Sequence, residues 1–325
     1  MGSILVCGGA GYIGSHMVRV LGRAGYQVTV FDDLSSGHRE AIEGVDLVVG
    51  NLADPQALAA VFDARKYDAV LHFAAKSLVG ESVLDPFRYY QNNVVGTLNL
   101  LVAMRAASVS KLVFSSTAAV YGVPVVPLID EGQPTRPINP YGFSKLVVEN
   151  MLADAQKAYG MASVSLRYFN AAGADEAGDI GESHDPETHL IPNVLKSVLG
   201  SGAGLQVYGD DYDTPDGTCV RDYVHVDDLC SAHLKALEYL QTNRDANVFN
   251  LGSNEGFSVR QVIKAAEKIT GRTVDYEVKP RRAGDPPRLV ASNAKAKDRL
   301  GWSPQRNDLD HILETAWRWH SQQRY

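Results

Sequence analysis

With 325 residues, 45% of them hydrophobic and 21% charged, the chain has the composition of a globular enzyme and the length of about two domains. Its formal net charge of −7 and the lack of any Lys/Arg run longer than a pair argue against nucleic acid or an anionic membrane as a partner. The three cysteines, Cys7, Cys219 and Cys230, are too scattered for a disulfide framework or a CxxC metal site, so we expect a reducing, cytoplasmic setting and no metal. We also expect neither export nor a membrane anchor, because no stretch approaches about 18 apolar residues.

The first half of the chain alternates short β-branched runs with helical patterns. Helices are expected at about 12–25, after Asp54, at 86–107 and from Tyr141 to about Tyr159. Strands are expected at "SILVCG", "QVTVFD", "DLVVG", "DAVLHFA", "KLVFSS" and "SVSLRYF". This βαβ alternation predicts an α/β protein with a Rossmann-like, doubly wound parallel sheet covered by helices on both faces.

Beyond Asn170 the chain becomes rich in Gly, Asp and Glu, and 171–189 is expected to be a long loop, which in compact enzymes is often functional. The elements that follow are shorter and mixed. Helices are expected at 190–200, 227–241 and 258–270 and twice near the C-terminus, with strands at "LQVYG", "VRDYVHV", "NVFNLG" and "TVDYEVKP". We therefore expect a Rossmann domain over residues 1–170, to which some later elements return, and a smaller mixed α/β lobe over 171–325.

A glycine-rich turn joins the first expected strand to the first helix. Gly8, Gly11 and Gly14 stand three residues apart, and such a turn lets a pyrophosphate approach the backbone at a helix N-terminus. Asp32 ends the second strand 18 residues after Gly14, where a carboxylate accepts both ribose hydroxyls of adenosine. Because Asp33 beside it would repel a 2′-phosphate, the expected cofactor is NAD rather than NADP.

A candidate reacting centre follows the strand "KLVFSS". Thr117 lies just beyond this strand, whose carboxyl end faces the ligand crevice of a parallel sheet. Tyr141 and Lys145 share one face of the next helix, since positions i and i+4 are neighbours. Oxidising an alcohol requires a base and a hydrogen-bond partner for its oxygen, roles that suit Tyr141 and Thr117. Lys145 is expected to lower the pKa of the phenol.

Several motifs carry a family resemblance over nearly the whole chain, among them "GGAGYIGSH", "FSSTAAVYG", "NPYGFSK", "LRYFNAAGA", "DGTCVRDYVHVDDL" and "PRRAGDPP". The chain resembles the sugar-nucleotide branch of the extended short-chain dehydrogenase/reductase superfamily, and within it the UDP-glucose 4-epimerase family. The resemblance implies a retained NAD that oxidises carbon 4 of UDP-galactose or UDP-glucose, after which the keto-sugar turns and takes the hydride back on its other face. It also implies a homodimer through the helix beginning near Pro86 and the helix that carries Tyr141.

The resemblance further implies two sets of ligand contacts. The cofactor-binding set comprises Gly8, Gly11, Tyr12, Ile13, Gly14, Asp32, Asp33, Asn51, Leu52, Phe73, Ala74, Ala75, Asn92, Ser115, Tyr141, Lys145, Tyr168 and Phe169. The substrate-binding set comprises Thr117, Asn170, His189, Leu190, Gln206, Tyr208, Arg221, Arg282, Asp285 and Leu289. The two arginines suit a diphosphate, which guanidinium groups bind bidentately. The alternative for each arginine is an ion pair with a surface carboxylate.

The chain departs from the family pattern at some positions. Thr117 stands where Ser is frequent, His189 where Asn is frequent, and Ser77 after Lys76 alters a stretch beside the cofactor. Leu289 stands where residue size is thought to decide whether an N-acetylated sugar fits, and Leu is intermediate.

Four alternative functions differ in what they demand of the sequence. Epimerases of UDP-N-acetylglucosamine or UDP-xylose would use the same reacting groups. A nucleotide-sugar 4,6-dehydratase needs an acid and a base directly after Thr117, where this chain has Ala118 and Ala119. A non-catalytic regulator that senses NAD would have no use for Thr117, Tyr141 and Lys145 together.

Overall fold

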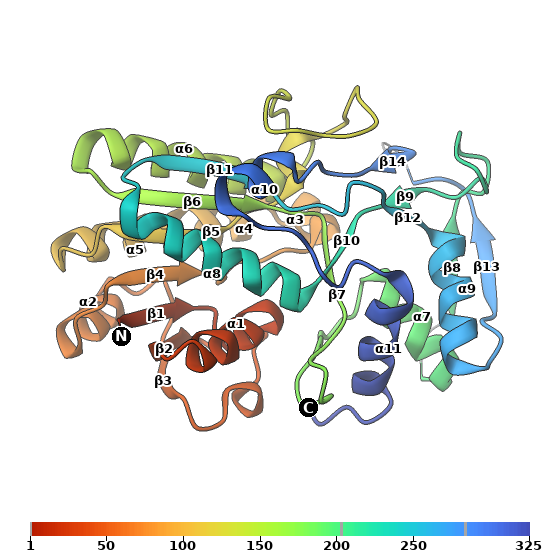
Figure 1. The fold of residues 1–325 in the computed structure, drawn as a ribbon, viewed down its shortest axis with the longest axis horizontal. Coiled ribbons are helices and arrows are strands. Elements are labelled where there is room, and N and C mark those ends of the chain that lie inside the picture. Colours follow the sequence, from red (N-terminus) through yellow and green to blue (C-terminus); the bar gives the residue numbers. More distant parts are fainter. Residues whose placement is uncertain (1, 202–203, 283–284) are drawn as a thin grey trace.

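The computed structural model describes residues 2–201, 204–282 and 285–325. Its largest sheet has seven parallel strands in the order β3-β2-β1-β4-β5-β6-β11 (Figure 1). These strands are β1 (Ser3–Cys7), β2 (Gln27–Asp32), β3 (Asp46–Val49), β4 (Ala69–His72), β5 (Lys111–Ser115), β6 (Ala162–Arg167) and β11 (Ala246–Asn250). The Rossmann-like fold is therefore confirmed. The strand order reverses at β1, and in such folds ligands bind beyond the carboxyl ends of the strands at this point.

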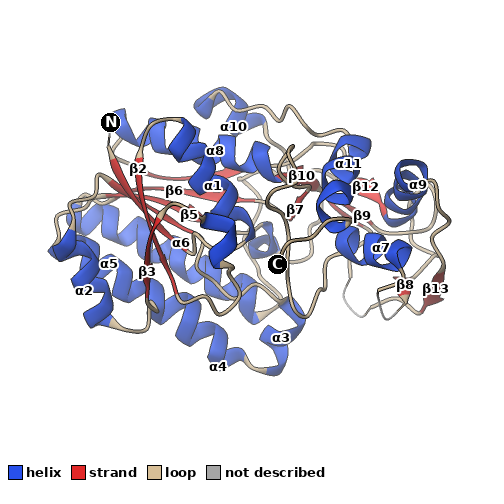
Figure 2. Ribbon diagram, turned by 90° about the horizontal axis from the view of Figure 1, so that it is seen from below, coloured by secondary structure: helices blue, strands red, loops and turns tan. Residues whose placement is uncertain are grey.

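Helices cover both faces of this sheet (Figure 2). One face carries α1 (Tyr12–Arg23), α8 (Val226–Thr242) and α10 (Ala294–Leu300), and the other carries α2 (Pro55–Ala64), α5 (Gly96–Ala106) and α6 (Pro140–Tyr159). Met17 and Trp302 are buried in the hydrophobic core on the first face of the sheet, and Leu58 and Phe114 are buried in the core on the opposite face. Burying each such side chain contributes about 1.5–3 kcal/mol. The apolar strands predicted from the sequence are thus covered on both sides.

The helix expected at 86–107 is interrupted. It consists of α4 (Pro86–Tyr89), a π-helical segment, η2 (Tyr90–Val95), and then α5. A shorter helix that the sequence did not predict, α3 (Val79–Leu84), precedes it, and single 3-10 turns occur at η1 (Arg39–Ile42) and η3 (Ala118–Tyr121). Wide π-helical turns often occur at functional sites, and this one carries Asn92 and Asn93.

The second lobe is built from three helices and short strands. The helices α7 (Leu190–Leu199), α9 (Val259–Thr270) and α11 (Leu309–His320) enclose a core that includes Val194, Val262 and Leu313. The strands form three small sheets, β10 (Tyr223–His225) with β7 (Asn170–Ala172), β12 (Phe257–Ser258) with β9 (Val220–Arg221) and β14 (Arg288–Leu289), and β13 (Tyr276–Lys279) with β8 (Leu205–Tyr208).

The prediction of an unbroken loop over 171–189 is wrong at its first residues. Asn170 to Ala172 form β7, because they pair with β10, about 50 residues later in the chain, in a parallel register. A pairing over that distance is not visible in the local composition. Across the described ranges, no helix combines the length and the apolar character needed to cross a membrane.

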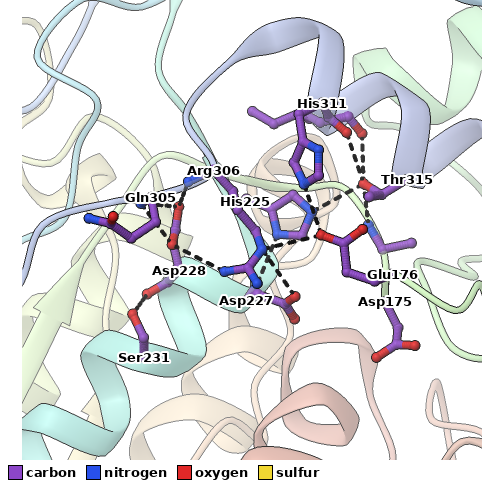
Figure 3. A network of polar contacts seen from close by, with 12 residues as sticks. Asp175, Glu176, His225, Asp227, Asp228, Ser231, Gln305, Arg306, His311 and Thr315 are labelled. Atoms are coloured by element: carbon purple, nitrogen blue, oxygen red, sulfur yellow. Dashed lines mark hydrogen bonds and ion pairs between the residues drawn. The ribbon is translucent and has the colours of Figure 1, made fainter.

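A polar network joins the segment after β7 to α8 and α11 (Figure 3). Near the start of α8, the buried carboxylate of Asp228 accepts the backbone N–H groups of Gln305 and Arg306, at 3.0 and 2.7 Å. The Arg306 guanidinium lies 3.3 Å from the Glu176 carboxylate, which also lies 2.9 Å from Nε2 of His311 on α11. The network therefore connects the segment after β7 to both halves of the molecule.

Candidate active site

Three glycines, two in the turn between β1 and α1 and one in the first turn of α1, stand in different surroundings. Gly8 has a φ of 76°, and a Cβ there would lie 2.4 Å from the backbone nitrogen of Ala74. A Cβ on Gly14 would lie 2.1 Å from the Gly8 carbonyl oxygen. A Cβ on Gly11, by contrast, would meet only that oxygen, at 3.5 Å, among the described residues. The protein itself therefore leaves room for a Cβ at Gly11, unlike at Gly8 and Gly14.

The same turn opens the N-terminus of α1. Gly11 is the N-cap of this helix and, within the described chain, provides no side-chain cap, so backbone N–H groups of the first turn remain available. Together with the positive end of the helix dipole, they suit an anion. Tyr12 and Ile13 are the first two residues of the helix. The turn thus fits the pyrophosphate of a dinucleotide.

Two acids and an amide meet beyond the ends of β2 and β3. The buried carboxylate of Asp32 accepts the N–H groups of Ala10 and Leu34, both at 2.9 Å. Burial raises the pKa of Asp32, although these two bonds oppose the shift. The carboxylate of Asp33 accepts a hydrogen bond of 2.5 Å from the Asn51 side-chain amide. Asp33 and Asn51, both members of the expected cofactor-binding set, are therefore in contact. Leu52, the residue after Asn51, is buried in the core.

The chain after β4 runs beside the glycine turn. The N–H groups of Phe73 and Ala74 both donate to the Cys7 carbonyl, at 2.8 and 3.1 Å, and Ala75 follows. The ring of Phe73 stands 4.8 Å from that of His233 on α8. This stretch is therefore held close to the expected dinucleotide path.

The sequence analysis missed Asn93, which lies beside Asn92 on the π-helical turn. Its buried amide accepts the N–H of Lys76 at 2.9 Å and donates to the Lys76 carbonyl and to Ser144 Oγ, both at 3.0 Å. Asn92 in turn donates to Asn93 at 3.0 Å. Asn93 thus connects the stretch after β4 to α6. The only local signal is a second Asn in "YYQNNVV".

The start of α6 directs Tyr141 and Lys145 towards the end of β5. Asn139 caps this helix by accepting the Gly142 N–H at 2.8 Å. One turn later, the buried Lys145 ammonium donates to the Ser115 carbonyl at 2.7 Å and lies 4.7 Å above the ring of Phe114. Burial lowers the pKa of Lys145 to about 7, although Glu149 opposes the shift.

Thr117 lies next to Tyr141. Its Oγ1 accepts the Ala119 N–H at 3.1 Å, so that Thr117 is the N-cap of η3. Burial raises the pKa of the Tyr141 phenol, and a hydrogen bond with the Thr117 side chain opposes this shift without cancelling it. The prediction that the phenol pKa would be lowered is therefore wrong for this structure, because loss of solvation dominates and the Lys145 ammonium is directed at the Ser115 carbonyl.

Further polar groups lie behind these residues. The hydroxyls of Ser115 and Tyr168 share a hydrogen bond of 2.5 Å, and burial raises the pKa of Tyr168. Glu149, on α6, accepts a bond of 2.5 Å from Ser116 Oγ and one of 2.9 Å from Arg167 Nε. The sequence analysis did not predict this buried ion pair, which fixes α6 against β6. An acid four residues after Lys145 was its only local signal.

The predicted arginines of the second lobe already have partners. The Arg221 guanidinium contacts the carboxylate of Asp285. The Arg282 guanidinium lies 3.9 Å from the centre of the Tyr208 ring, and the Tyr208 hydroxyl donates to Gln206 at 2.6 Å. The two residues between Arg282 and Asp285 lie outside the described ranges. The alternative of an ion pair thus holds for Arg221, but its partner also belongs to the predicted substrate-binding set.

Leu289 connects this lobe to the reacting centre. It pairs with Arg221 across β14 and β9, and together with Phe169 it packs on a buried cluster that includes Ala118, the neighbour of Thr117. Asn170 donates its side-chain amide to the Asp222 carbonyl at 2.8 Å. The residue is thereby held at the start of β7.

His189 and Leu190 begin α7. His189 is the N-cap, with its Nδ1 facing Glu182 and Glu187, whereas Leu190 packs against the core of the second lobe. The side chains of His189 and Leu190 therefore point in different directions, although the two residues are adjacent in the chain.

Comparisons with known proteins agree with this geometry. The model of the NAD dependent epimerase/dehydratase family matches residues 4–252. UDP-glucose 4-epimerases of Halalkalibacterium halodurans and Lacticaseibacillus casei are 51% and 50% identical to the chain, over 98% of it and 96% of each relative. The chain belongs to the UDP-glucose 4-epimerase family.

Solved structures of this family superpose closely. The UDP-glucose 4-epimerase from Brucella ovis in complex with NAD is 48% identical with a TM-score of 0.96, and the match covers 98% of both chains. The UDP-Glc/GlcNAc 4-epimerase from Campylobacter jejuni is 43% identical with a TM-score of 0.88, over 99% of this chain and 100% of that one. The family resemblance drawn from the motifs is therefore confirmed, and the protein is an NAD-dependent enzyme.

Proposed function

We propose that the protein interconverts UDP-galactose and UDP-glucose by transient oxidation of sugar carbon 4. The observation that carries this proposal is the meeting of Tyr141, Thr117 and Lys145 near the end of β5, at the same edge of the parallel sheet as the glycine turn after β1. Full-length relatives named UDP-glucose 4-epimerase support the choice of substrate.

Each of the three residues has a distinct part in the proposed reaction. Tyr141 takes the proton of the 4-hydroxyl, and Thr117 donates a hydrogen bond to the same oxygen. Lys145 binds the nicotinamide ribose and stabilises the phenolate that forms. The bound nicotinamide would supply the acceptor, and later the donor, of the hydride at carbon 4. Tyr141 gives its proton back to the oxygen after the sugar has turned, so the product is an isomer and nothing is consumed.

The second lobe would hold the nucleotide and leave the hexose free to turn. Arg221 and Arg282 would bind the diphosphate, which carries two negative charges. Since Arg221 already contacts Asp285, the diphosphate must displace or share this carboxylate. Asn170, Gln206 and Tyr208, from the implied substrate-binding set, would contact the uridine.

We further propose a homodimer through one apolar surface. On α3, α4 and α5 the side chains of Leu84, Phe87 and Val102 are 87%, 81% and 61% exposed. The helices α3 and α4 pack against α6, where Phe143 is also exposed. Exposed apolar side chains gathered on adjacent helices favour an interface between proteins.

The free, buried cysteines suit a reducing cytoplasm.

The division into two units is also part of the proposal. Residues 1–170 would form the NAD-binding domain together with the returning α8, β11 and α10, and the remainder of 171–325 would bind the UDP-sugar. The packing of α8 on α1 and of β11 on β6 supports this assignment.

A second candidate substrate is UDP-N-acetylglucosamine. The relative from Campylobacter jejuni is named a UDP-Glc/GlcNAc 4-epimerase. Leu289 is intermediate in size at the position where residue size is thought to decide whether an N-acetylated sugar fits. Both substrates would use the same reacting groups.

The test is to mix purified protein with UDP-galactose without adding cofactor. We expect UDP-glucose to form, and denaturing the protein should release NAD. A Tyr141→Phe variant that retains its NAD is the control for contaminating epimerase. Intact protein that contains NAD but forms no UDP-glucose or other epimer from any UDP-sugar would contradict the proposed function.

A further inference from the structure

Four metal-binding side chains converge in the segment between β7 and α7. Glu182, His184, Glu187 and His189 each offer one ligand atom, and these atoms all lie within 4.8 Å of one another. Nδ1 of His189 lies 2.7 Å from Glu182 Oε1 and 3.0 Å from Glu187 Oε1. Nδ1 of His184 lies 3.1 Å from Glu182 Oε1 and 3.7 Å from Glu187 Oε2.

We propose that these four side chains bind one divalent transition-metal ion, with Zn²⁺ as the best fit. Zinc prefers four ligands at roughly 2.0–2.2 Å when these are imidazole nitrogen and carboxylate oxygen. A tetrahedron of that size has edges of roughly 3.4 Å, and the nitrogen–oxygen distances lie on both sides of this value. Small side-chain rotations would therefore create the site.

The carboxylates make this cluster different from an ordinary surface ion pair. The side chains of Glu182 and Glu187 are only 6% and 3% exposed. Within the described part of the chain, Glu187 Oε2 is buried and has no hydrogen-bond donor, whereas Oε1 accepts the N–H groups of Thr188 and His189, both at 2.8 Å. A buried carboxylate oxygen without a donor is costly unless a cation binds it.

The backbone around the cluster is held from outside, so that the site is formed in advance. The Trp319 indole on α11 donates to the Glu182 carbonyl at 2.8 Å, and Nε2 of His38 lies 3.2 Å from the Ser183 carbonyl. Since four protein ligands fill a tetrahedral site, the metal would be structural rather than catalytic. It would hold the start of α7, and would fix His189 so that only its Nε2 remains available to a ligand.

The scattered cysteines had predicted no metal site. The eight residues "ESHDPETH" do carry a signal, since Glu and His alternate at positions 182, 184, 187 and 189. A polar loop can display such a pattern without a function, and it is the convergence of the side chains that makes it informative.

The test is to titrate chelator-treated, NAD-containing protein with Zn²⁺ by calorimetry and to measure the metal content by mass spectrometry. We expect one equivalent of bound Zn²⁺ and a higher melting temperature. Co²⁺ should give the visible absorption of a tetrahedral site. Wild-type protein that binds less than one equivalent of Zn²⁺ would overturn the proposal and leave an ion-pair network only.

Two variants locate the site. His184→Ala should weaken Zn²⁺ binding by at least roughly 100-fold, since even loss of a residue that only supports a metal ligand costs about 10–100-fold. His311→Ala is the matched control, because His311 also lies against a glutamate, Glu176 at 2.9 Å, but outside the cluster. If His184→Ala does not fold, Glu187→Gln replaces it. Equal Zn²⁺ affinity of the cluster variant and the control would overturn the assignment.

Discussion

The cofactor edge of the large sheet and the substrate lobe hold their functional groups in different ways. At the cofactor edge, strand ends, glycines and a helix N-terminus form the site, and Asp32 and Lys145 are bound to backbone groups. In the substrate lobe, long side chains from two-residue strands and loops contact one another, as Arg221 contacts Asp285. The first region is therefore fixed before a ligand binds, whereas in the proposed function the second would exchange its internal contacts for those of the ligand.

This difference predicts different responses to substitution. In the first region, small changes to the backbone should destroy binding or folding, because no rotation of a side chain can compensate. In the second region, single substitutions should weaken binding by limited factors, because each arginine carries only part of the interaction with the diphosphate.

The largest effects are expected at the glycine turn. Gly14→Ala places a Cβ 2.1 Å from a carbonyl oxygen and should prevent accumulation of folded protein. Gly11→Ala meets no such obstacle in the protein and should fold with a melting temperature within a few degrees of wild type, yet lose its NAD. Thermal unfolding and the NAD content of purified protein measure the two effects. An NAD content unchanged in Gly11→Ala would show that this position does not face the dinucleotide.

At the reacting centre, Tyr141→Phe should lower turnover of UDP-galactose by at least about 100-fold, because a general base contributes 10² or more. The NAD content and the melting temperature should remain close to wild type. Tyr159→Phe, at the exposed end of the same helix, is the matched control and should retain full activity. Turnover of Tyr141→Phe within threefold of wild type would remove the tyrosine from the mechanism.

In the substrate lobe, Arg221→Leu should raise the KM for UDP-galactose by about 10–100-fold. The reason is that a hydrogen bond between charged groups contributes roughly 1.5–3 kcal/mol of binding free energy. The effect on kcat should be small, since the contact is present before and during oxidation. Arg281→Leu removes an exposed arginine that pairs with Asp211 and serves as the control. Similar KM values for both variants would assign Arg221 a structural role only.

The smallest effect is expected at Leu289. Replacing it with Tyr should lower the relative rate for UDP-N-acetylgalactosamine against UDP-galactose by about tenfold, since a steric difference in a pocket is worth roughly 1–3 kcal/mol. Leu289→Ser should shift the ratio in the opposite direction. Leu199→Tyr, at the exposed end of α7, controls for added bulk. An unchanged ratio in both Leu289 variants would exclude this residue as a determinant of specificity.

The same contrast explains how much could be predicted from the sequence. The strands of the large sheet, the glycine turn and the spacing of Tyr141 and Lys145 are local patterns, and the structure has them close to the expected positions. The strands β7, β12 and β14 depend on partners far along the chain, so local patterns did not define them.

Electrostatic effects were harder to predict than positions. The phenol pKa of Tyr141 was predicted in the wrong direction because burial cannot be read from a four-residue spacing. Asn93 and the ion pair of Glu149 with Arg167 also escaped notice, since each acts between elements that only the fold brings together. The sequence thus identified candidate groups, but the fold determined their charge states.

The most direct test follows the hydrogen on carbon 4. UDP-galactose that carries deuterium at this carbon is converted in ordinary water by protein with its own NAD, and the product is analysed by NMR. If the hydride leaves and returns within one site, the UDP-glucose formed keeps its deuterium at carbon 4. Loss of the deuterium to solvent, or its appearance at another carbon, would contradict the proposed mechanism.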